Sequence, residues 1–414
     1  MENREVQLSD IVKGVAASFD SSFTANWWSN VMEHLSARKI FYVLLALSGL
    51  VVLAAAMAGA DALNMGQRLT YGTTREIPWG LLIATYIFFV VTSTGLCIVS
   101  SIGHVFGLES FMPIAKRSVF LAIVTILSGF SVIFFDIENP FRMAIWNVLS
   151  PNLRSNIWWM GTLYGAYLVF MIIEYTFLLV GKHRFAMYAG LSGLISGIAA
   201  HSNLGAIFGA LAARPFWYGP FMPIYFIASA MMSGSAAIIF FTYLGYKLND
   251  EKMDAPMERA LESVGKVAAL LISILLFFET WKVITGLDGG AMEVATVKAI
   301  LTGPYAVNFL GFEILIGMVI PFILFLRSRF RNVGMMFAAS VLMLIGIFMM
   351  RYDLVIFGQI VPGYYELGVN GYSHLMVYHP SFHEIMITAG GMAIAAMTFL
   401  LGERVFKGHK SEIH

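Results

Sequence analysis

Residues 193–209 read GLISGIAAHSNLGAIFG, a stretch of seventeen residues without aspartate, glutamate, lysine or arginine. Glycines stand at 193, 197, 205 and 209, and His201 takes the place where a fifth small residue would continue the series. Small residues let neighbouring membrane helices approach closely. A four-residue repeat drifts by roughly 40° per step on an α-helix, so the glycines spiral along it. The stretch therefore predicts a closely packed membrane helix that carries one buried imidazole.

The composition of the whole chain is that of a polytopic membrane protein. Of its 414 residues, 58% are hydrophobic and 12% are charged, whereas soluble domains carry about 25% charged residues. The net charge of +1 excludes nucleic acid as a main partner. Because Cys97 is the single cysteine, the chain holds no iron–sulfur cluster or thiolate-bound zinc as a metal site of its own. The same count excludes c-type haem attachment and internal disulfides. Thiolate-bound electron carriers must therefore belong to another subunit.

Ten segments are long and apolar enough to cross a bilayer, which takes about 20 residues. They are 40–60, 79–104, 117–136, 156–180, 186–210, 220–246, 264–286, 304–327, 333–358 and 382–402. We therefore predict an all-α membrane protein in three parts: a cytoplasmic or interfacial segment 1–39, which contains Trp27 and Trp28, a ten-helix domain 40–402, and a tail 403–414. The first apolar run begins near residue 40, so no signal peptide is expected.

A weak internal repeat groups the helices. Helices 2 and 6 both begin after a proline and an aromatic residue, in IPWG and GPFM, and both have small-residue middles, TSTG and SGSAA. An offset of four helices preserves orientation. We therefore predict two parallel four-helix bundles, helices 2–5 and helices 6–9, with helices 1 and 10 at their flanks. Transporters also arise from such repeats.

The basic residues set the orientation. With the N-terminus in the cytoplasm, 17 lysines and arginines lie in inner segments and 6 in outer loops, which the positive-inside rule favours. Both termini are then cytoplasmic, and the long loops 61–78, 137–155, 287–303 and 359–381 face outside. These loops are aromatic rather than charged, which suits either a docking surface for an extracytoplasmic partner or simple caps on the bundles.

Ionisable residues within membrane spans are costly and mark functional sites by default. The candidates near the outer side are Asp136, Glu138, Arg142, Glu279, Lys282, Arg351 and Asp353, with His201 and Glu313 on the order of 15 Å deep. His104 and Glu174 lie toward the inner side. Each has a structural alternative: Glu279 and Lys282 are one turn apart and can neutralise each other, and His201 can be a hydrogen-bonded core residue. Arg351 and Asp353 point in different directions and each needs a partner on another helix.

A quinone fits this set of side chains. Its ring needs hydrogen-bond donors at its carbonyls and a route for two protons, and its tail needs an apolar cleft. A neutral histidine supplies a donor that titrates near working pH, and a nearby carboxylate relays the proton. A b-type haem is the rival, but it usually needs paired histidines on facing helices, and only His201 lies deep.

Five stretches carry a family resemblance. They are PWGLLIATYIFF (78–89), DIENPFR (136–142), SNIWWMGTLYGAYLVFMIIEY (155–175), ARPFWYGPFMPIYFIASAMMSG (213–234) and HPSFHEIMITAG (379–390). In order and over essentially the whole chain, they resemble the NrfD-like integral membrane family, which includes the subunits PsrC and HybB. The ten-span layout is similar to that of HybB and departs from the eight spans of PsrC.

The resemblance implies a cofactor-free, quinone-reactive anchor in the cytoplasmic (inner) membrane of a prokaryote. Such subunits bind an extracytoplasmic iron–sulfur subunit of the four-cluster type, which connects to a molybdopterin-type enzyme, a hydrogenase or a multihaem cytochrome c. We therefore expect electron exchange with menaquinone or another quinone, by a subunit that is not catalytic alone and holds no haem or iron–sulfur cluster.

The expected roles fall into two groups. Quinone binding is assigned to His201, Asp136, Arg142 and Asn203, and proton transfer to Glu174, His104, Glu279 and Glu313. A cytoplasmic proton route that starts at Glu174 and His104 would make turnover separate charge across the membrane. A secondary transporter built from two repeats, and a purely structural anchor, remain open alternatives.

Overall fold

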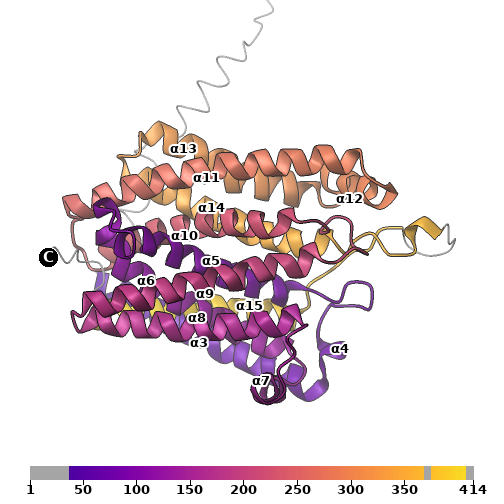
Figure 1. The fold of residues 1–414 in the computed structure, drawn as a ribbon, viewed down its shortest axis with the longest axis horizontal. Helices are drawn as coiled ribbons and strands as arrows, with labels where there is room; N and C mark the ends of the chain where they lie inside the picture. The colour runs from indigo at the N-terminus through magenta and orange to yellow at the C-terminus, as the bar shows by residue number, and fades with distance from the viewer. Residues whose placement is uncertain (1–36, 368–373, 407–414) are drawn as a thin grey trace, which may run out of the picture.

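The computed structural model describes residues 37–367 and 374–406, and this part of the chain is helical without any strand (Figure 1). All ten predicted spans are confirmed. The spanning helices are α3 (Ala37–Met65), α5 (Leu81–His104), α6 (Met112–Asp136), α8 (Asn156–Leu179), α9 (His183–Gly209), α10 (Phe221–Leu248), α11 (Ala255–Leu287), the π-helix η2 (Val307–Val319) continued by α13 (Ile320–Ser328), α14 (Val333–Phe357) and α15 (Phe382–Phe406).

Two spans begin earlier than the apolar runs predict. A 3-10 turn, η1 (Glu109–Phe111), leads into α6 at Met112, and α11 begins at Ala255. Both helices have a proline in their first turn, and the Asp254 side chain caps α11 by accepting a hydrogen bond from the Met257 amide at 2.9 Å. Hydropathy marks only the part of a helix that lies in hydrocarbon. It therefore misses turns that continue into the charged interface.

Four short helices lie within the segments predicted as long outer loops. They are α4 (Gln67–Thr70), α7 (Pro140–Leu149), α12 (Ala291–Leu301) and η3 (Tyr365–Leu367). The connections that carry them gather at one end of the molecule, at the right of Figure 1. We call this the outer end, after its predicted orientation, and the opposite end the inner end. Trp27 and Trp28 lie outside the described residues, as does most of the predicted tail 403–414.

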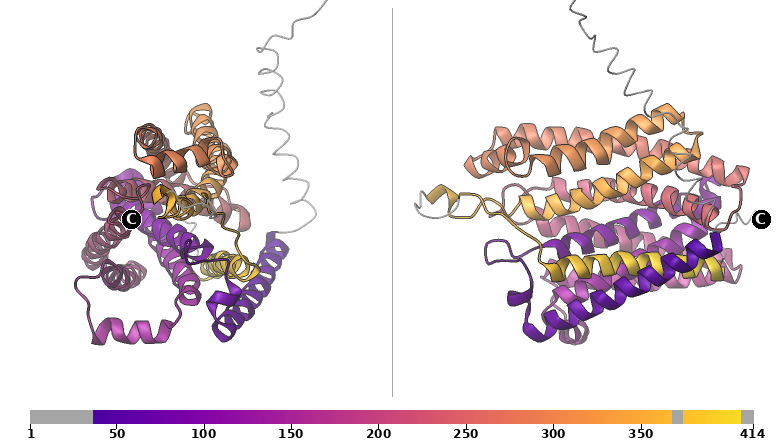
Figure 2. Two further views of the ribbon diagram at one scale, coloured as in Figure 1. Left: turned by 90° about the vertical axis from the view of Figure 1, so that its right-hand side faces the viewer. Right: turned by 180° about the vertical axis from the view of Figure 1, so that it is seen from behind.

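The spanning helices form the two predicted bundles. Helices α5, α6, α8 and α9 pack together, as do α10, α11, η2–α13 and α14, and α10 packs on α5 to join the two groups. The first and last spans, α3 and α15, pair with each other beside the first bundle (Figure 2). The small-residue middles of α5 and α10 meet at the junction, where Gly95 and Gly234 bring the two backbones into direct contact.

The glycines of α9 follow the predicted spiral. Gly193 and Gly197 face α8, where a Cβ would meet Met171 and Tyr167. Gly205 and Gly209 face the start of α10 and the turn before it, where a Cβ would lie 2.7 Å from the Pro223 Cα and 2.6 Å from the Gly219 oxygen. One face of α9 thus changes neighbours along its length. The space beside these glycines is filled by those neighbours.

Candidate functional site

A histidine–glutamate pair lies near the inner end of the first bundle. His104 Nδ1, on the last residue of α5, is 3.2 Å from Glu174 Oε1 on α8, and both side chains are at most 5% exposed. Gly190 of α9 makes room for this carboxylate, because a Cβ there would lie 2.7 Å from Glu174 Oε1. His104 Nε2 is buried without a hydrogen-bond partner among the described residues. The predicted inner candidates His104 and Glu174 therefore form one site.

A column of polar side chains continues outward along α8. Glu174, Tyr167 and Tyr164, with the apolar Met171 between Glu174 and Tyr167, are spaced three or four residues apart, so they share the face of α8 that points into the bundle. Cys97 of α5 lies next to both Tyr167 and Glu174. The Tyr167 hydroxyl donates to the Ser93 carbonyl at 3.0 Å and contacts the Ser93 hydroxyl at 2.9 Å.

His201 completes the column and is fully buried. Its Nε2 lies 2.9 Å from the Phe226 carbonyl oxygen, which can only accept, so Nε2 carries the proton and donates. Nδ1 is then the acceptor for the Tyr164 hydroxyl, 3.0 Å away. Both ring nitrogens of His201 are therefore occupied by the protein. Asn203 donates to the Asn156 carbonyl at 2.7 Å and joins no hydrogen bond to His201 among the described residues.

Asp136 lies at the outer end of α6. The Gln67 side-chain amide donates to the Phe135 and Asp136 carbonyls at 3.1 and 2.8 Å, and the Tyr71 hydroxyl donates to the Phe135 carbonyl at 2.7 Å. These bonds hold the end of the helix. Asp136 is a half-buried residue, and its carboxylate accepts no hydrogen bond from the described residues.

A second outer carboxylate, Glu384, is fully engaged. It accepts hydrogen bonds from the Gly72 and Ser381 amides at 2.7 and 2.9 Å and from the Tyr378 hydroxyl. Tyr378 also accepts from the Leu81 amide at 2.8 Å, at the start of α5. Burial and the Glu384 charge raise the pKa of Tyr378, so its hydroxyl stays protonated and donates. This network, missed by the sequence analysis, ties two outer loops to α5 and α15.

Arg142 projects from α7, whose side chains are mostly exposed. No hydrogen bond or ion pair within the described chain connects Arg142 to Asp136. Large apolar side chains of α7 are exposed as well: Phe141, Met143, Ile145, Trp146, Val148 and Leu149. An apolar helix thus lies directly after the Asp136 carboxylate.

The second bundle holds a denser charged cluster in its outer half. Glu279 of α11, Glu313 of η2, and Arg351 and Asp353 of α14 are each at most 4% exposed. The electrostatic neighbours of Arg351 include Glu313 and Glu279. Lys282 lies with its Nζ 4.0 Å from the centre of the Phe216 ring and forms no ion pair with Glu279 within 4.0 Å. The structural alternative, a direct ion pair between Glu279 and Lys282, is therefore not formed.

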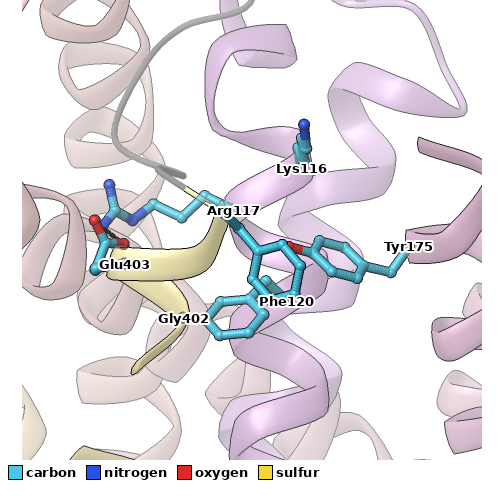
Figure 3. Close-up of a pocket in the computed structure, with 7 residues that line it drawn as sticks. Lys116, Arg117, Phe120, Tyr175, Gly402 and Glu403 are labelled. Atoms are coloured by element: carbon cyan, nitrogen blue, oxygen red, sulfur yellow. Dashed lines mark hydrogen bonds and ion pairs between the residues drawn. The ribbon is translucent and has the colours of Figure 1, made fainter. Parts of the chain in front are cut away.

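An ion pair that the sequence analysis missed lies near the inner end. Arg117 of α6 contacts the Glu403 carboxylate of α15, and Figure 3 shows the Arg117 side chain turned toward Glu403 while Lys116 points elsewhere. Arg117 is 2% exposed, and Gly245 of α10 makes room for its guanidinium. Phe120 and Tyr175 line a cavity of about 10 Å³ beside the pair. The sequence gives no sign that Arg117 has a partner so far along the chain.

Comparison with known proteins identifies the family. A family model described as polysulphide reductase, NrfD, matches residues 70–363. The chain belongs to the NrfD family. It is a multi-pass membrane protein of that family, as the resemblance implied, and its described part holds no group of three or more side chains suited to a metal ion.

Three relatives extend the comparison. A selenate reductase subunit of Mesobacillus selenatarsenatis is 23% identical over 87% of this chain and 92% of its own length. The Hdr-like menaquinol oxidoreductase integral membrane subunit of Archaeoglobus fulgidus is 22% identical over 81% of this chain and 86% of its own. A putative dimethyl sulfoxide reductase membrane subunit of Halobacterium salinarum is 26% identical over 80% and 84%.

Proposed function

We propose that this chain is the quinone-interacting membrane subunit of a respiratory oxidoreductase complex, embedded in a prokaryotic cytoplasmic membrane. The observation that carries the proposal is the buried polar column of the first bundle, from His104 and Glu174 to Tyr164 and His201, in a member of the NrfD family. A relative of similar length is a menaquinol oxidoreductase subunit by name. The polar column is costly in a membrane, and proton exchange with a quinone gives it a use.

The proposed partner is an extracytoplasmic iron–sulfur subunit of the four-cluster type. Relatives named as selenate and dimethyl sulfoxide reductase subunits support a reductase complex as the setting. The lone cysteine requires electron carriers in another chain. The outer helices α4, α7, α12 and η3 supply the surface for docking, and a molybdopterin-type enzyme, a hydrogenase or a multihaem cytochrome c completes the electron path.

We place the quinone ring at Asp136, a half-buried residue beside apolar α7 whose carboxylate has no internal hydrogen bond among the described residues. Oxidation of a quinol supplies two electrons, which the partner's iron–sulfur centre would take, and two protons, which Asp136 would accept one after the other and pass to outer water. Reduction reverses each transfer. Arg142 holds the loop after Asp136. In this proposal His201 and Asn203 support the site without binding the ring directly, because their own hydrogen bonds are already made within the protein.

Replacing Asp136 with Asn should slow quinone-linked electron transfer by at least about ten-fold, because the amide cannot take up a proton. The measurement is turnover of the assembled complex in membranes with a menaquinol analogue. Turnover of the same complex with a water-soluble dye that reacts directly with the partner should be unchanged.

Glu138→Gln is the matched control, since Glu138 is exposed only two residues away and should keep normal turnover. Unchanged quinone turnover in Asp136→Asn would remove Asp136 from the site. A lone chain that purifies without redox partners and moves a substrate across vesicles would instead support the secondary transporter.

Proton transfer is the second part of the proposal. Glu174 and His104 exchange protons with the inner compartment. Glu279 and Glu313 transfer protons within the second bundle. Glu174→Gln keeps the shape of the side chain but cannot ionise. We expect it to lower proton exchange with the inner compartment by at least about ten-fold per electron transferred. A pH indicator trapped in oriented vesicles measures this.

The exposed Glu109 on the inner connection provides the control as Glu109→Gln. Equal proton exchange in Glu174→Gln and Glu109→Gln would show that the buried pair is only structural.

A further inference from the structure

The charged cluster of the second bundle has polar atoms that its own side chains leave unsatisfied. All three guanidinium nitrogens of Arg351, both carboxylate oxygens of Asp353 and Glu279 Oε1 are buried without a hydrogen-bond partner among the described residues. Arg351 is 0% and Asp353 1% exposed. A buried polar group left unsatisfied costs about 1–3 kcal/mol, and more when it is charged. Such atoms therefore point to hydration of the cluster.

A cavity beside the cluster has room for water at Glu279, the one of these unsatisfied groups that lines it. Its volume is about 10 Å³, and its polar lining comes from Tyr225, Glu279, Lys282 and Glu313. This is about the volume that one water needs, and a buried water typically makes about three hydrogen bonds. Glu313 lies in the middle of the π-helix η2. Irregular turns of this kind are frequently found at functional sites.

The charges of the cluster favour one bound proton. Glu279, Glu313 and Asp353 bring three negative charges, whereas Arg351 and Lys282 bring two positive charges. A net charge is costly within a membrane. The cluster becomes neutral when one of the three carboxylates takes up a proton.

Arg351 connects this cluster to the polar column of the first bundle. Its Cζ lies 5.5 Å from the centre of the Phe226 ring, and the Phe226 carbonyl accepts the hydrogen bond of His201. Tyr164 and His201 both interact electrostatically with Arg351. Arg351 also interacts electrostatically with Glu313 and Glu279. One side chain therefore lies within electrostatic range of both polar groups.

The repeat places the two groups at corresponding depths. His201 lies eight residues before the outer end of α9, and Arg351 lies six residues before the outer end of α14. Tyr164 and Glu313 lie eight and six residues after the outer starts of α8 and η2. These helices correspond under the four-helix offset. In the first bundle these positions hold the neutral pair Tyr164 and His201. In the second bundle they hold the ionisable pair Glu313 and Arg351.

We infer that Glu279, Glu313 and Asp353, gathered around Arg351, form a hydrated proton-holding site that exchanges protons with the Tyr164–His201 pair. This inference rests on the proposed function. A proton enters at His104 and Glu174 in the first bundle, crosses beside Arg351, and leaves through the second bundle toward Lys282. It passes between water and carboxylate oxygens, and no electron moves in these steps. Arg351 is a positioning residue whose charge keeps the carboxylates together.

The test uses the whole complex in proteoliposomes and measures quinone turnover and proton translocation separately. Asp353→Asn should lower the number of protons translocated per electron by at least about two-fold, because a proton-relay group contributes far more than this to transfer. Turnover in the presence of an uncoupler should stay unchanged. Glu258→Gln, at an exposed carboxylate in the first turn of α11, is the control and should leave both measurements unchanged.

Tyr164→Phe tests the crossing between the bundles. If both groups belong to one route, Tyr164→Phe and Asp353→Asn each lower the proton yield, and the double variant lowers it no further. Additive losses would show two separate routes and overturn the crossing. An unchanged yield in Asp353→Asn combined with Glu313→Gln would overturn the site itself.

A spectroscopic measurement tests the same site if a variant loses the coupling of proton translocation to electron transfer for other reasons. Infrared difference spectra of the complex, between oxidised and reduced quinone, should contain a carboxylic acid band that Glu313→Gln or Asp353→Asn removes. A spectrum unchanged in both variants would contradict proton holding there. Failure of Asp136→Asn to slow turnover would instead contradict the quinone site, so the two proposals fail by different results.

Discussion

Replacing Gly95 with Ala should destabilise the protein by more than the 1–3 kcal/mol that is typical of overpacking in a core. The added Cβ would meet the Ala230 carbonyl oxygen and the Gly234 amide of α10, which are backbone atoms. A backbone cannot rotate away as a side chain can, so α5 and α10 must separate. This contact joins the two bundles, and we expect little folded protein. Yield and thermal unfolding of the purified chain in detergent measure the effect.

Gly165→Ala is the matched control. Gly165 lies in α8 with no atom near the position of an added Cβ. Because Ala is favoured over Gly in a helix by about 1 kcal/mol, this variant should be as stable as the original or slightly more so. Equal stability of Gly95→Ala and Gly165→Ala would mean that α5 and α10 do not touch as described.

Replacing Arg117 with Met should cost about 3–5 kcal/mol of the free energy of unfolding, the usual effect of removing one partner of a buried ion pair. The Glu403 carboxylate would remain buried, 4% exposed, and would lose the guanidinium that it contacts. The double variant Arg117→Met/Glu403→Met should lose less than the single one, because no uncompensated charge remains. The free energy of unfolding is measured by SDS titration of the purified original protein, the single variant and the double variant.

The exposed pair of Lys266 and Glu262 on α11 provides the comparison. Its members are four residues apart and solvated, so Lys266→Met should cost less than about 1 kcal/mol. An Arg117→Met variant as stable as Lys266→Met would show that the inner ion pair contributes nothing to the fold.

The spans and their grouping could be predicted because both are recorded locally. The length of each apolar run marks a span, and the small middles of helices 2 and 6 mark the place where Gly95 and Gly234 now meet. The inner starts of α6 and α11 could not be predicted by hydropathy, because their first turns lie outside the apolar run, next to charged residues. Arg117 gave no signal either, since its partner Glu403 lies at the other end of the described chain.

The candidate site was predicted less completely, for a physical reason. A histidine within a span indicates a buried imidazole, but it does not say which atoms satisfy it. His201 is satisfied by Tyr164, on another helix, and by the carbonyl of Phe226, which no side-chain pattern reveals. Glu279 and Glu313 were predicted to share a proton-transfer role, but not to gather with Asp353 around Arg351. Only the packing of α11, η2 and α14 brings them together around Arg351.

The pairing of α3 with α15 has a consequence for how the protein is made. Among the described spans, the ribosome delivers α3 first and α15 last, so the main packing partner of α3 arrives only after the other described spans have been made. The arriving α15 then places Gly390 against Ala55 and supplies Glu384 and Glu403 to elements that were already inserted. A chain that stops before α15 keeps the Arg117 charge buried and unmatched. The arrival of α15 therefore completes contacts at both ends of the molecule, and copies that lack it can be recognised in the membrane by that charge.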